Sequence, residues 1–222
     1  MALRRDSVTG QSAGPDFAGH ERNGDGPPQA IVGVLALQGD FKEHRALLEV
    51  LGVQTREVRT SSQLEGLDAL IIPGGESTTI ARLIVSNQLR DPLRSFCHSG
   101  RPVWGTCAGA ILLAASVDDL DRPGIETMDM SIARNAFGRQ VDSFEEDLLI
   151  DELTGPPFHA VFIRAPSILS VGPQAKVLAR LSDGTIVAAR QRNLLATVFH
   201  PELTSDSRLH TYFLGMRNGA RR

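Results

Sequence analysis

One cysteine, Cys107, lies in a context that favours a nucleophile. It belongs to the run Gly105-Thr106-Cys107-Ala108-Gly109, which is the nucleophile-elbow pattern with Cys in place of Ser. A sharp strand-to-helix turn strains the backbone of the nucleophile and leaves room only for small neighbours. The sulfur would then lie at a helix N-terminus, where free N–H groups favour the thiolate. The alternative is a small buried side chain beside two packing glycines.

A histidine is the usual partner of a thiol that attacks an amide, because protons must be moved. His200 has the most informative context, since it follows a strand-like stretch and is succeeded by Pro201 and Glu202. The residue before proline is kept out of the helical region, and residues two apart in extended backbone project to the same side. We therefore predict that Glu202 contacts the His200 ring and fixes its tautomer. The other histidines lack such a context: His20, His44, His98, His159 and His210.

Acyl transfer also needs N–H donors for the developing oxyanion. Ala108, directly after the nucleophile, supplies one by the geometry of the elbow. We predict the second in the glycine turn Pro73-Gly74-Gly75-Glu76-Ser77-Thr78, because ligands collect at the carboxyl ends of strands in an α/β sheet. The alternative is a tight connection that needs glycine for its backbone alone. A phosphate-binding loop is disfavoured, since no Gly-Lys-Ser/Thr follows.

Alternating strand and helix signals surround these motifs. Short apolar runs and turn-bounded segments predict strands at residues 31–37, 67–72, 102–104, 128–134, 161–163, 176–181, 186–189 and 194–199. Helical spacing predicts helices at residues 41–51, 93–98, 110–115 and 205–216, and a further helix capped by Ser77 or Thr78. The pattern indicates an α/β fold, with a mostly parallel sheet flanked by helices and an antiparallel extension.

The bulk composition suits a globular domain after a different N-terminal stretch. The chain of 222 residues is 41% apolar and 22% charged, which is ordinary for a soluble protein. Residues 1–29 are rich in Gly, Pro, Asp, Ser and Asn, so we expect a disordered tail there and one domain over residues 30–222. The tail lacks the apolar core of a signal peptide.

Charge and cysteine content exclude several function classes. A net charge of −3 and a pI near 6.1 give no indication of nucleic-acid binding, and no apolar run is long enough to span a membrane. Cys97 and Cys107 are expected to be free thiols in a reducing cytoplasm, with Cys97 in a structural position on a helix. We expect neither a metal nor a cofactor.

Taken together, these motifs make the sequence resemble the class I glutamine amidotransferases, and more closely the PdxT/SNO family of glutaminase subunits of pyridoxal 5′-phosphate synthase. The resemblance covers about residues 30–216, and the stretches 134–145 and 162–166 are specific to this family. Besides the elbow and the glycine turn, the matching segments are residues 33–39 with Glu43 and His44, residues 134–145, residues 162–166 and residues 199–204. Ala136 stands where the family more usually has Ser.

The resemblance implies a class I amidotransferase-like, flavodoxin-like fold and a triad of Cys107, His200 and Glu202. The implied glutamine contacts are Gly75, Glu76, Ser77, Arg134, Ile163 and Arg164, with Gly75 and Ala108 as the oxyanion hole. An arginine is a natural partner for the α-carboxylate of the substrate. Without the family, Arg134 and Arg164 would be interpreted as solvated surface residues.

The implied activity is hydrolysis of L-glutamine to glutamate and ammonia. The resemblance also implies a hetero-oligomeric complex with a barrel-shaped synthase subunit, which makes pyridoxal 5′-phosphate from ribose 5-phosphate and glyceraldehyde 3-phosphate. It further implies that the glutaminase is nearly silent until docked. Two alternatives stay open: another cysteine-elbow hydrolase or amidotransferase branch, and a non-catalytic regulatory subunit that kept the fold. The intact set of Cys107, His200 and Glu202 speaks against the second.

Overall fold

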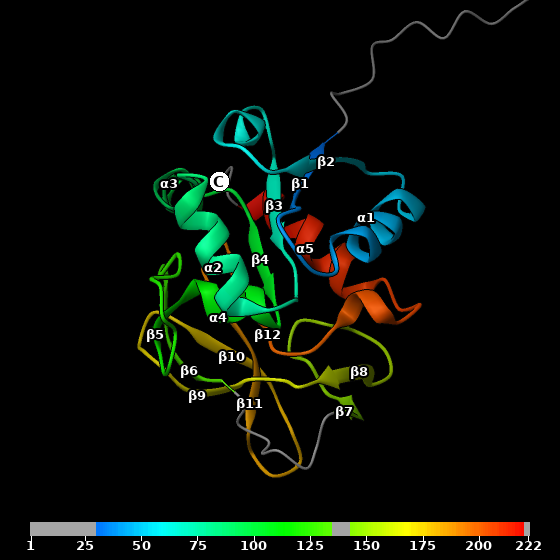
Figure 1. Cartoon of the computed structure of the whole chain (residues 1–222). Coiled ribbons are helices and arrows are strands. Elements are labelled where there is room, and N and C mark those ends of the chain that lie inside the picture. The colour runs from blue at the N-terminus through cyan, green and yellow to red at the C-terminus, as the bar shows by residue number, and fades with distance from the viewer. Residues whose placement is uncertain (1–29, 135–142, 220–222) are drawn as a thin grey trace, which may run out of the picture.

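The computed structural model describes residues 30–134 and 143–219. Its centre is a sheet of ten strands with helices on both faces (Figure 1). Five strands form a parallel half in the order β2-β1-β3-β4-β12. Their bounds are Gln54–Val58 for β2, Ile31–Leu35 for β1, Ala69–Ile72 for β3, Val103–Thr106 for β4 and Leu194–Thr197 for β12. This half matches the parallel sheet expected from the short apolar runs.

The second half of the sheet is mostly antiparallel. β11 pairs with β12, β10 and β9 in antiparallel register, β9 pairs with β6 in the same way, and β5 is parallel to β6. Their bounds are Ile186–Gln191 for β11, Lys176–Arg180 for β10, Ser167–Val171 for β9, Met128–Ala133 for β6 and Ala114–Val117 for β5. A separate antiparallel pair joins β7 (Ser143–Leu148) to β8 (Phe158–Ile163). The predicted α/β fold with an antiparallel extension is therefore confirmed.

Helices cover the two faces of the sheet. α1 (Phe41–Val50) and α5 (Arg208–Gly219) lie on one face, and α2 (Ser77–Ser86), α3 (Arg90–His98) and α4 (Ala108–Leu113) lie on the other (Figure 1). Two 3-10 turns complete the described elements, η1 at Ser61–Leu64 and η2 at Pro201–Leu203. None of the helices in residues 30–134 and 143–219 combines the length and apolarity that crossing a membrane requires.

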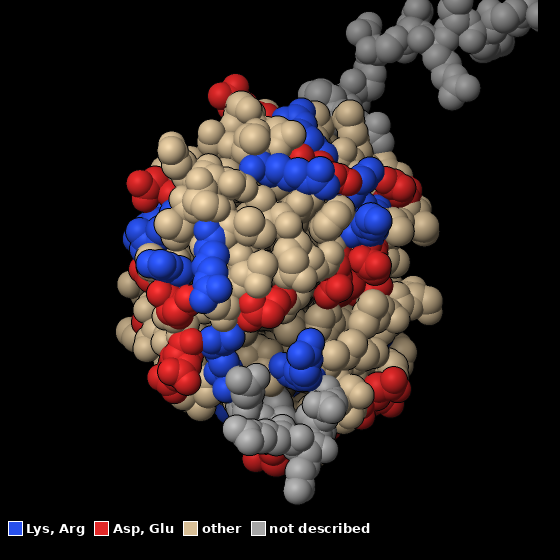
Figure 2. Space-filling view, viewed as in Figure 1, with Lys and Arg blue, Asp and Glu red and all other residues tan. Residues whose placement is uncertain are grey.

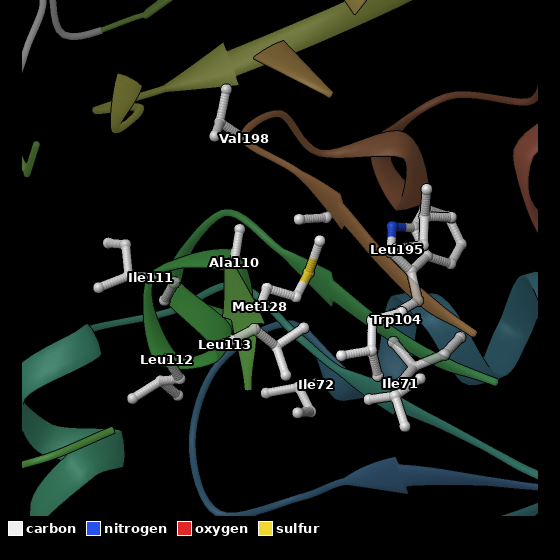
Figure 3. Close-up of a cluster of buried hydrophobic side chains, with 14 of the residues drawn as sticks. Ile71, Ile72, Trp104, Ala110, Ile111, Leu112, Leu113, Met128, Leu195 and Val198 are labelled. Carbon is white, nitrogen blue, oxygen red and sulfur yellow. The ribbon is translucent and has the colours of Figure 1, made fainter. Parts of the chain in front are cut away.

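A row of large apolar side chains crosses the parallel strands beneath α1 and α5. Trp104 on β4 is the register partner of Ile71 on β3 and of Leu195 on β12 (Figure 3). All three are fully buried, and each such side chain stabilises the fold by about 1.5–3 kcal/mol relative to exposure. The Trp104 ring also packs against Phe213 of α5 and donates from its indole Nε1 to Thr197 Oγ1 at 3.1 Å. This row holds the ends of β3, β4 and β12 in fixed register.

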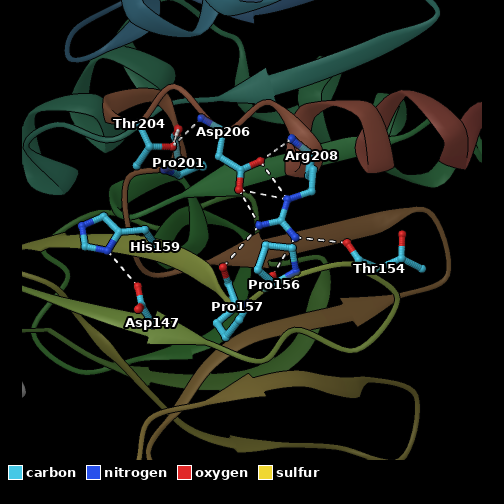
Figure 4. A network of polar contacts seen from close by, with 9 residues as sticks. All are labelled: Asp147, Thr154, Pro156, Pro157, His159, Pro201, Thr204, Asp206 and Arg208. Atoms are coloured by element: carbon cyan, nitrogen blue, oxygen red, sulfur yellow. Dashed lines mark hydrogen bonds and ion pairs between the residues drawn. The ribbon is translucent and has the colours of Figure 1, made fainter.

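A network around Arg208 joins the start of α5 to the segment before β8 (Figure 4). Its guanidinium pairs with Asp206 at 2.6 Å and donates to the carbonyls of Pro156 at 2.7 Å and Thr154 at 3.1 Å. Multidentate geometry makes such an arginine more stabilising than an isolated surface ion pair. The network fixes the segment after β12 relative to β8.

Three local predictions were wrong. The apolar run predicted as a helix at residues 110–115 divides into α4, which already begins at Ala108, and β5, which begins at Ala114. Periodicity cannot separate a buried helix from a buried strand in so short a run. The cap of α2 is Glu76, whose carboxylate accepts from the N–H groups of Thr78 and Thr79, and neither Ser77 nor Thr78 takes this position. Four strands, β2, β5, β7 and β9, were not predicted.

Charged side chains of both signs are interspersed over the face shown in Figure 2. This mixture of charges agrees with the small net charge of −3. On this face the basic side chains do not form the continuous stripe expected of a nucleic-acid-binding face. The predicted tail at residues 1–29, most of the family-specific stretch after Arg134 and the last three residues lie outside the described residues.

Candidate active site

A pocket of about 350 Å³ lies at the carboxyl ends of the parallel strands. The segments after β1, β3, β4 and β12 bring Gln38, Gly75, Cys107 and His200 to this edge of the sheet. Nine of the ten predicted site residues line it: Gly75, Glu76, Ser77, Cys107, Ala108, Arg134, Ile163, Arg164 and His200. The tenth, Glu202, is buried next to His200. Ligands of α/β proteins bind at this edge.

The predicted strand–turn–helix geometry is present at Cys107. Its φ of +46° and ψ of −105° are strained for a residue with a side chain. Its N–H donates to Thr197 O at 2.8 Å, so β12 holds the turn in place. A Cβ at Gly105 would lie 2.5 Å from the Gly109 backbone, and a Cβ at Gly109 would lie 1.9 Å from Ile72 O. The two glycines thus allow the turn to pack against itself and against β3.

The predicted contact between His200 and Glu202 is also present, at 2.7 Å between Nδ1 and Oε1. The backbone differs from the prediction, because β12 ends at Thr197 and residues 201–203 form the turn η2 where extended backbone was expected. The N–H of His200 donates to Val161 O at 2.8 Å, which ties the segment to β8. A Cβ at Gly74 would lie 2.6 Å from the His200 ring, so glycine allows this ring to approach the turn after β3.

Electrostatics favour a charged His200. Burial alone would lower its pKa, but hydrogen bonds with Asp40, Cys107 and Glu202 together raise the pKa to about 12. The Asp40 carboxylate contributes from 3.4 Å, on the same ring nitrogen that Glu202 contacts. Burial raises the pKa of Glu202, and the hydrogen bond with His200 opposes that rise. A charged imidazole beside the sulfur is the setting in which cysteine reacts as a thiolate.

Two backbone N–H groups are candidates for the predicted oxyanion site. Within the described residues, the N–H groups of Gly75 and Ala108 donate to no protein acceptor. Gly75 has a φ of +144°, which a residue with a side chain rarely adopts. The adjacent Glu76 N–H donates to Gln38 Oε1 at 2.8 Å, so the Gln38 side chain holds the turn from the end of β1. Gly75 and Ala108 line the same pocket as Cys107.

The lining of the pocket also carries opposite charges. Arg134 donates to Thr78 Oγ1 at 2.9 Å and approaches the Glu76 carboxylate to 3.5 Å. Burial would raise the pKa of Glu76, but hydrogen bonds from Thr79 and Thr78 lower it, so the carboxylate stays charged. Arg164 is exposed at the rim, with a strained φ of +42°. Strain at a residue of this kind is typical of functional sites.

The second cysteine has a different environment. Cys97 on α3 is buried, and burial raises the pKa of its thiol to about 11. Both cysteines are free. A thiol with so high a pKa is a poor nucleophile at neutral pH, which agrees with the structural position expected for Cys97.

Several residues at the site were not identified as candidates from the sequence, among them Gln38, Asp40 and His44. Gln38 and Asp40 directly follow a predicted strand, so their position at its carboxyl end was the available signal. Asp40, His200 and Glu202 also bring donor atoms within 4.8 Å of one another, as a metal site would. His200 Nδ1 already contacts both carboxylates, so a metal bound through this nitrogen would have to displace them.

Comparisons with known proteins agree on one family of relatives. The model of a family described as the SNO glutamine amidotransferase family matches residues 34–218. The chain is 57% identical to the pyridoxal 5′-phosphate synthase subunit PdxT of Moorella thermoacetica, over 83% of this chain and 98% of the relative. It is 55% identical to the PdxT subunit of Herpetosiphon aurantiacus, over 83% of this chain and 99% of the relative.

Solved structures show the same fold. One, described as the crystal structure of a glutamine amidotransferase, superposes with a TM-score of 0.80 at 50% identity, over 84% of this chain and 98% of that chain. A putative GMP synthase protein from Thermoplasma acidophilum superposes with a TM-score of 0.65 at 18% identity, over 87% of this chain and 96% of that chain. At that identity the second likeness concerns the fold alone.

Proposed function

The chain belongs to the SNO glutamine amidotransferase family, and from this premise we propose that it hydrolyses L-glutamine to glutamate and ammonia for a pyridoxal 5′-phosphate synthase. The observation that carries the proposal is the alignment of three groups at one edge of the pocket. Cys107 lies at the strained turn, His200 contacts it, and Glu202 Oε1 lies 2.7 Å from His200 Nδ1. This is the constellation of an acyl-transfer enzyme.

The proposed reaction begins when the Cys107 thiolate attacks the side-chain amide carbon of glutamine. The oxyanion that forms accepts hydrogen bonds from the N–H groups of Gly75 and Ala108. His200 then protonates the nitrogen of this intermediate, the C–N bond breaks to release ammonia, and a thioester remains on Cys107. Water, deprotonated by the same imidazole, attacks the thioester and releases glutamate.

Charges in the lining of the pocket fit the other end of an amino-acid substrate. Arg134 and Arg164 supply positive charge for the α-carboxylate. Glu76 supplies negative charge for the α-ammonium group while it caps α2. Ile163 also lines the pocket and offers an apolar side chain to the aliphatic stem of glutamine. In this arrangement the enzyme binds both ends of the substrate.

The proposed partner of this chain is a synthase subunit that consumes the ammonia. Free ammonia becomes ammonium in neutral water and then loses its nucleophilicity, so a covered route to the consumer is an advantage. The rim of the pocket supports such a cover, because it exposes Leu203 at 45% and Ile163 at 38%. Apolar side chains exposed at a site are typical of surfaces that meet a partner. Two free thiols suit the reducing cytoplasm as the place of action.

Replacement of the nucleophile tests the proposal. We expect Cys107→Ala to lower ammonia release from glutamine by a factor on the order of 10³ or more, with the synthase subunit of the same organism present. Cys97→Ala is the matched control and should leave the rate unchanged. Glutamine hydrolysis that survives in purified Cys107→Ala would contradict the assignment.

A further inference from the structure

A buried polar cluster contacts Glu202 without lining the pocket. It consists of His44 on α1, Thr106 at the end of β4 and His210 on α5, and each of these residues is 0% exposed. His44 Nε2 lies 3.1 Å from Thr106 Oγ1 and 3.3 Å from Glu202 Oε2. On its other side, His44 Nδ1 lies 3.1 Å from His210 Nε2. Three elements thus converge on the carboxylate that orients the proposed base.

Both buried histidines are neutral at physiological pH. Burial lowers the pKa of His44 well below its usual range, and the neighbouring His210 and His200 lower it further. Burial likewise lowers the pKa of His210 to about 4. A neutral imidazole carries one N–H and one bare nitrogen, so the cluster requires a specific pair of tautomers.

One assignment of tautomers suits the surroundings of His44, because a proton on Nε2 can be donated to Thr106 Oγ1 at 3.1 Å and also faces the Glu202 carboxylate. A bare His44 Nε2 would present its lone pair to a carboxylate oxygen at 3.3 Å, whereas a proton on that nitrogen makes the same approach attractive. His44 Nδ1 then accepts from His210 Nε2–H. His210 Nδ1 has no hydrogen-bond partner in the described residues, and as a bare nitrogen it costs less to bury than an unpaired N–H would.

We propose that His44 is a positioning residue for the glutamine hydrolysis proposed above. Its Nε2–H contacts Thr106 Oγ1 at 3.1 Å and attracts Glu202 Oε2 from 3.3 Å, so that Oε1 stays on His200 Nδ1, and His210 fixes the tautomer of His44. Glu202 Oε2 is buried and accepts no well-formed hydrogen bond within the described residues, and the approach of His44 Nε2 to 3.3 Å is the contact that can compensate its charge. Loss of the His44 donor would leave that oxygen uncompensated and free the carboxylate to turn from His200.

The alternative is a merely structural role, since the Trp104 ring packs edge-on against both His44 and His210. Three variants separate the two roles. His44→Leu removes the donor and keeps an apolar side chain of similar bulk, and His44→Gln keeps an amide N–H near the Nε2 position. Leu48→Ala removes a fully buried side chain one turn further along the same helix, away from the cluster.

The experiment measures kcat and KM for glutamine in the complex with the synthase subunit, below the melting temperature of every variant. We expect His44→Leu to lower kcat by roughly 10-fold with KM within about twofold, as for loss of a positioning contact. His44→Gln should recover most of kcat. Leu48→Ala should lower the melting temperature and leave kcat unchanged. An unchanged kcat in His44→Leu, or equal losses in all three variants, would overturn the proposal.

A second readout does not depend on glutamine. The proton on His200 Nδ1, shared with Glu202, should give a downfield ¹H NMR signal that shifts or broadens in His44→Leu and persists in His44→Gln. The wild-type complex could lack glutaminase activity while the NMR signal still changes in His44→Leu and persists in His44→Gln. That result would refute the proposed function and leave the positioning role standing. If the enzyme is active but the signal is unchanged in both variants, only the positioning role is refuted.

Discussion

At the scale of single residues, the candidate reactive groups could be predicted from the sequence more readily than the residues around them. Cys107, His200 and Glu202 could be predicted because the glycines of an elbow and a proline between two polar residues are local signals. His44 could not, since its contacts lie 62 and 166 residues away in the chain and a helical histidine has many possible neighbours. The Glu202 contact was predicted correctly on an incorrect assumption of extended backbone.

The buried histidine His210 predicts a specific loss of stability in acid. Its pKa is about 4 in the folded chain, against about 6.5 when unfolded. The unfolded state therefore binds more protons between these values, so the stabilising contribution is complete above about pH 6.5 and is lost as the pH falls toward 4. At about pH 5 the loss from this residue is about 2 kcal/mol.

Urea unfolding of the wild type and of His210→Gln, at about pH 7 and about pH 5, measures this contribution. Glutamine does not titrate, so the variant should lose about 2 kcal/mol less on acidification than the wild type. Equal losses in the two proteins would show that His210 does not titrate between these pH values.

At the scale of elements, the close contact of α4 with β3 should be the most sensitive to a small substitution. Gly109→Ala would place a Cβ 1.9 Å from Ile72 O, a backbone atom that cannot move without displacing β3. We expect a loss of about 2 kcal/mol or more in unfolding free energy, measured by urea denaturation. Because α4 begins beside Cys107, glutaminase activity should fall as well.

Gly215→Ala on α5 is the matched control, because a Cβ there meets no atom within 4 Å. Alanine is the better helix former, so this substitution should stabilise the chain by up to about 1 kcal/mol. A Gly109→Ala protein as stable as the wild type would show that α4 can move away from β3.

The elements that were predicted differ physically from those that were missed. β1, β3 and β4 are buried on both faces, and their continuous apolar runs are distinctive. β2, with sequence Gln-Thr-Arg-Glu-Val, is an edge strand, and β7 is largely polar. Their strand state depends on pairing with partners elsewhere in the chain, which local sequence does not encode.

At the scale of the whole molecule, the rim of the pocket should control activation by the synthase partner. Leu203→Glu places a charge on an apolar side chain that is 45% exposed beside the pocket. We expect the synthase concentration for half-maximal glutaminase activity to rise by about 10-fold, since burying an unpaired charge at an interface is costly. Ammonia release, recorded while the synthase is titrated into the glutaminase, measures this concentration.

Val50→Glu on α1 provides the comparison. Val50 is 82% exposed and does not line the pocket, so its charge should leave the activation curve unchanged. An unaltered curve for Leu203→Glu, or full activity of the isolated wild-type chain, would contradict a partner that covers this rim.

The central claim, that Cys107 attacks glutamine, is tested most directly by covalent labelling with a glutamine-mimicking diazoketone, followed by mass spectrometry of the peptides. We expect one adduct, on Cys107, which forms in the complex and is suppressed by excess glutamine. Cys97 should stay unmodified because burial raises the pKa of its thiol to about 11. An adduct on another residue, or no adduct in a complex that hydrolyses glutamine, would contradict the account.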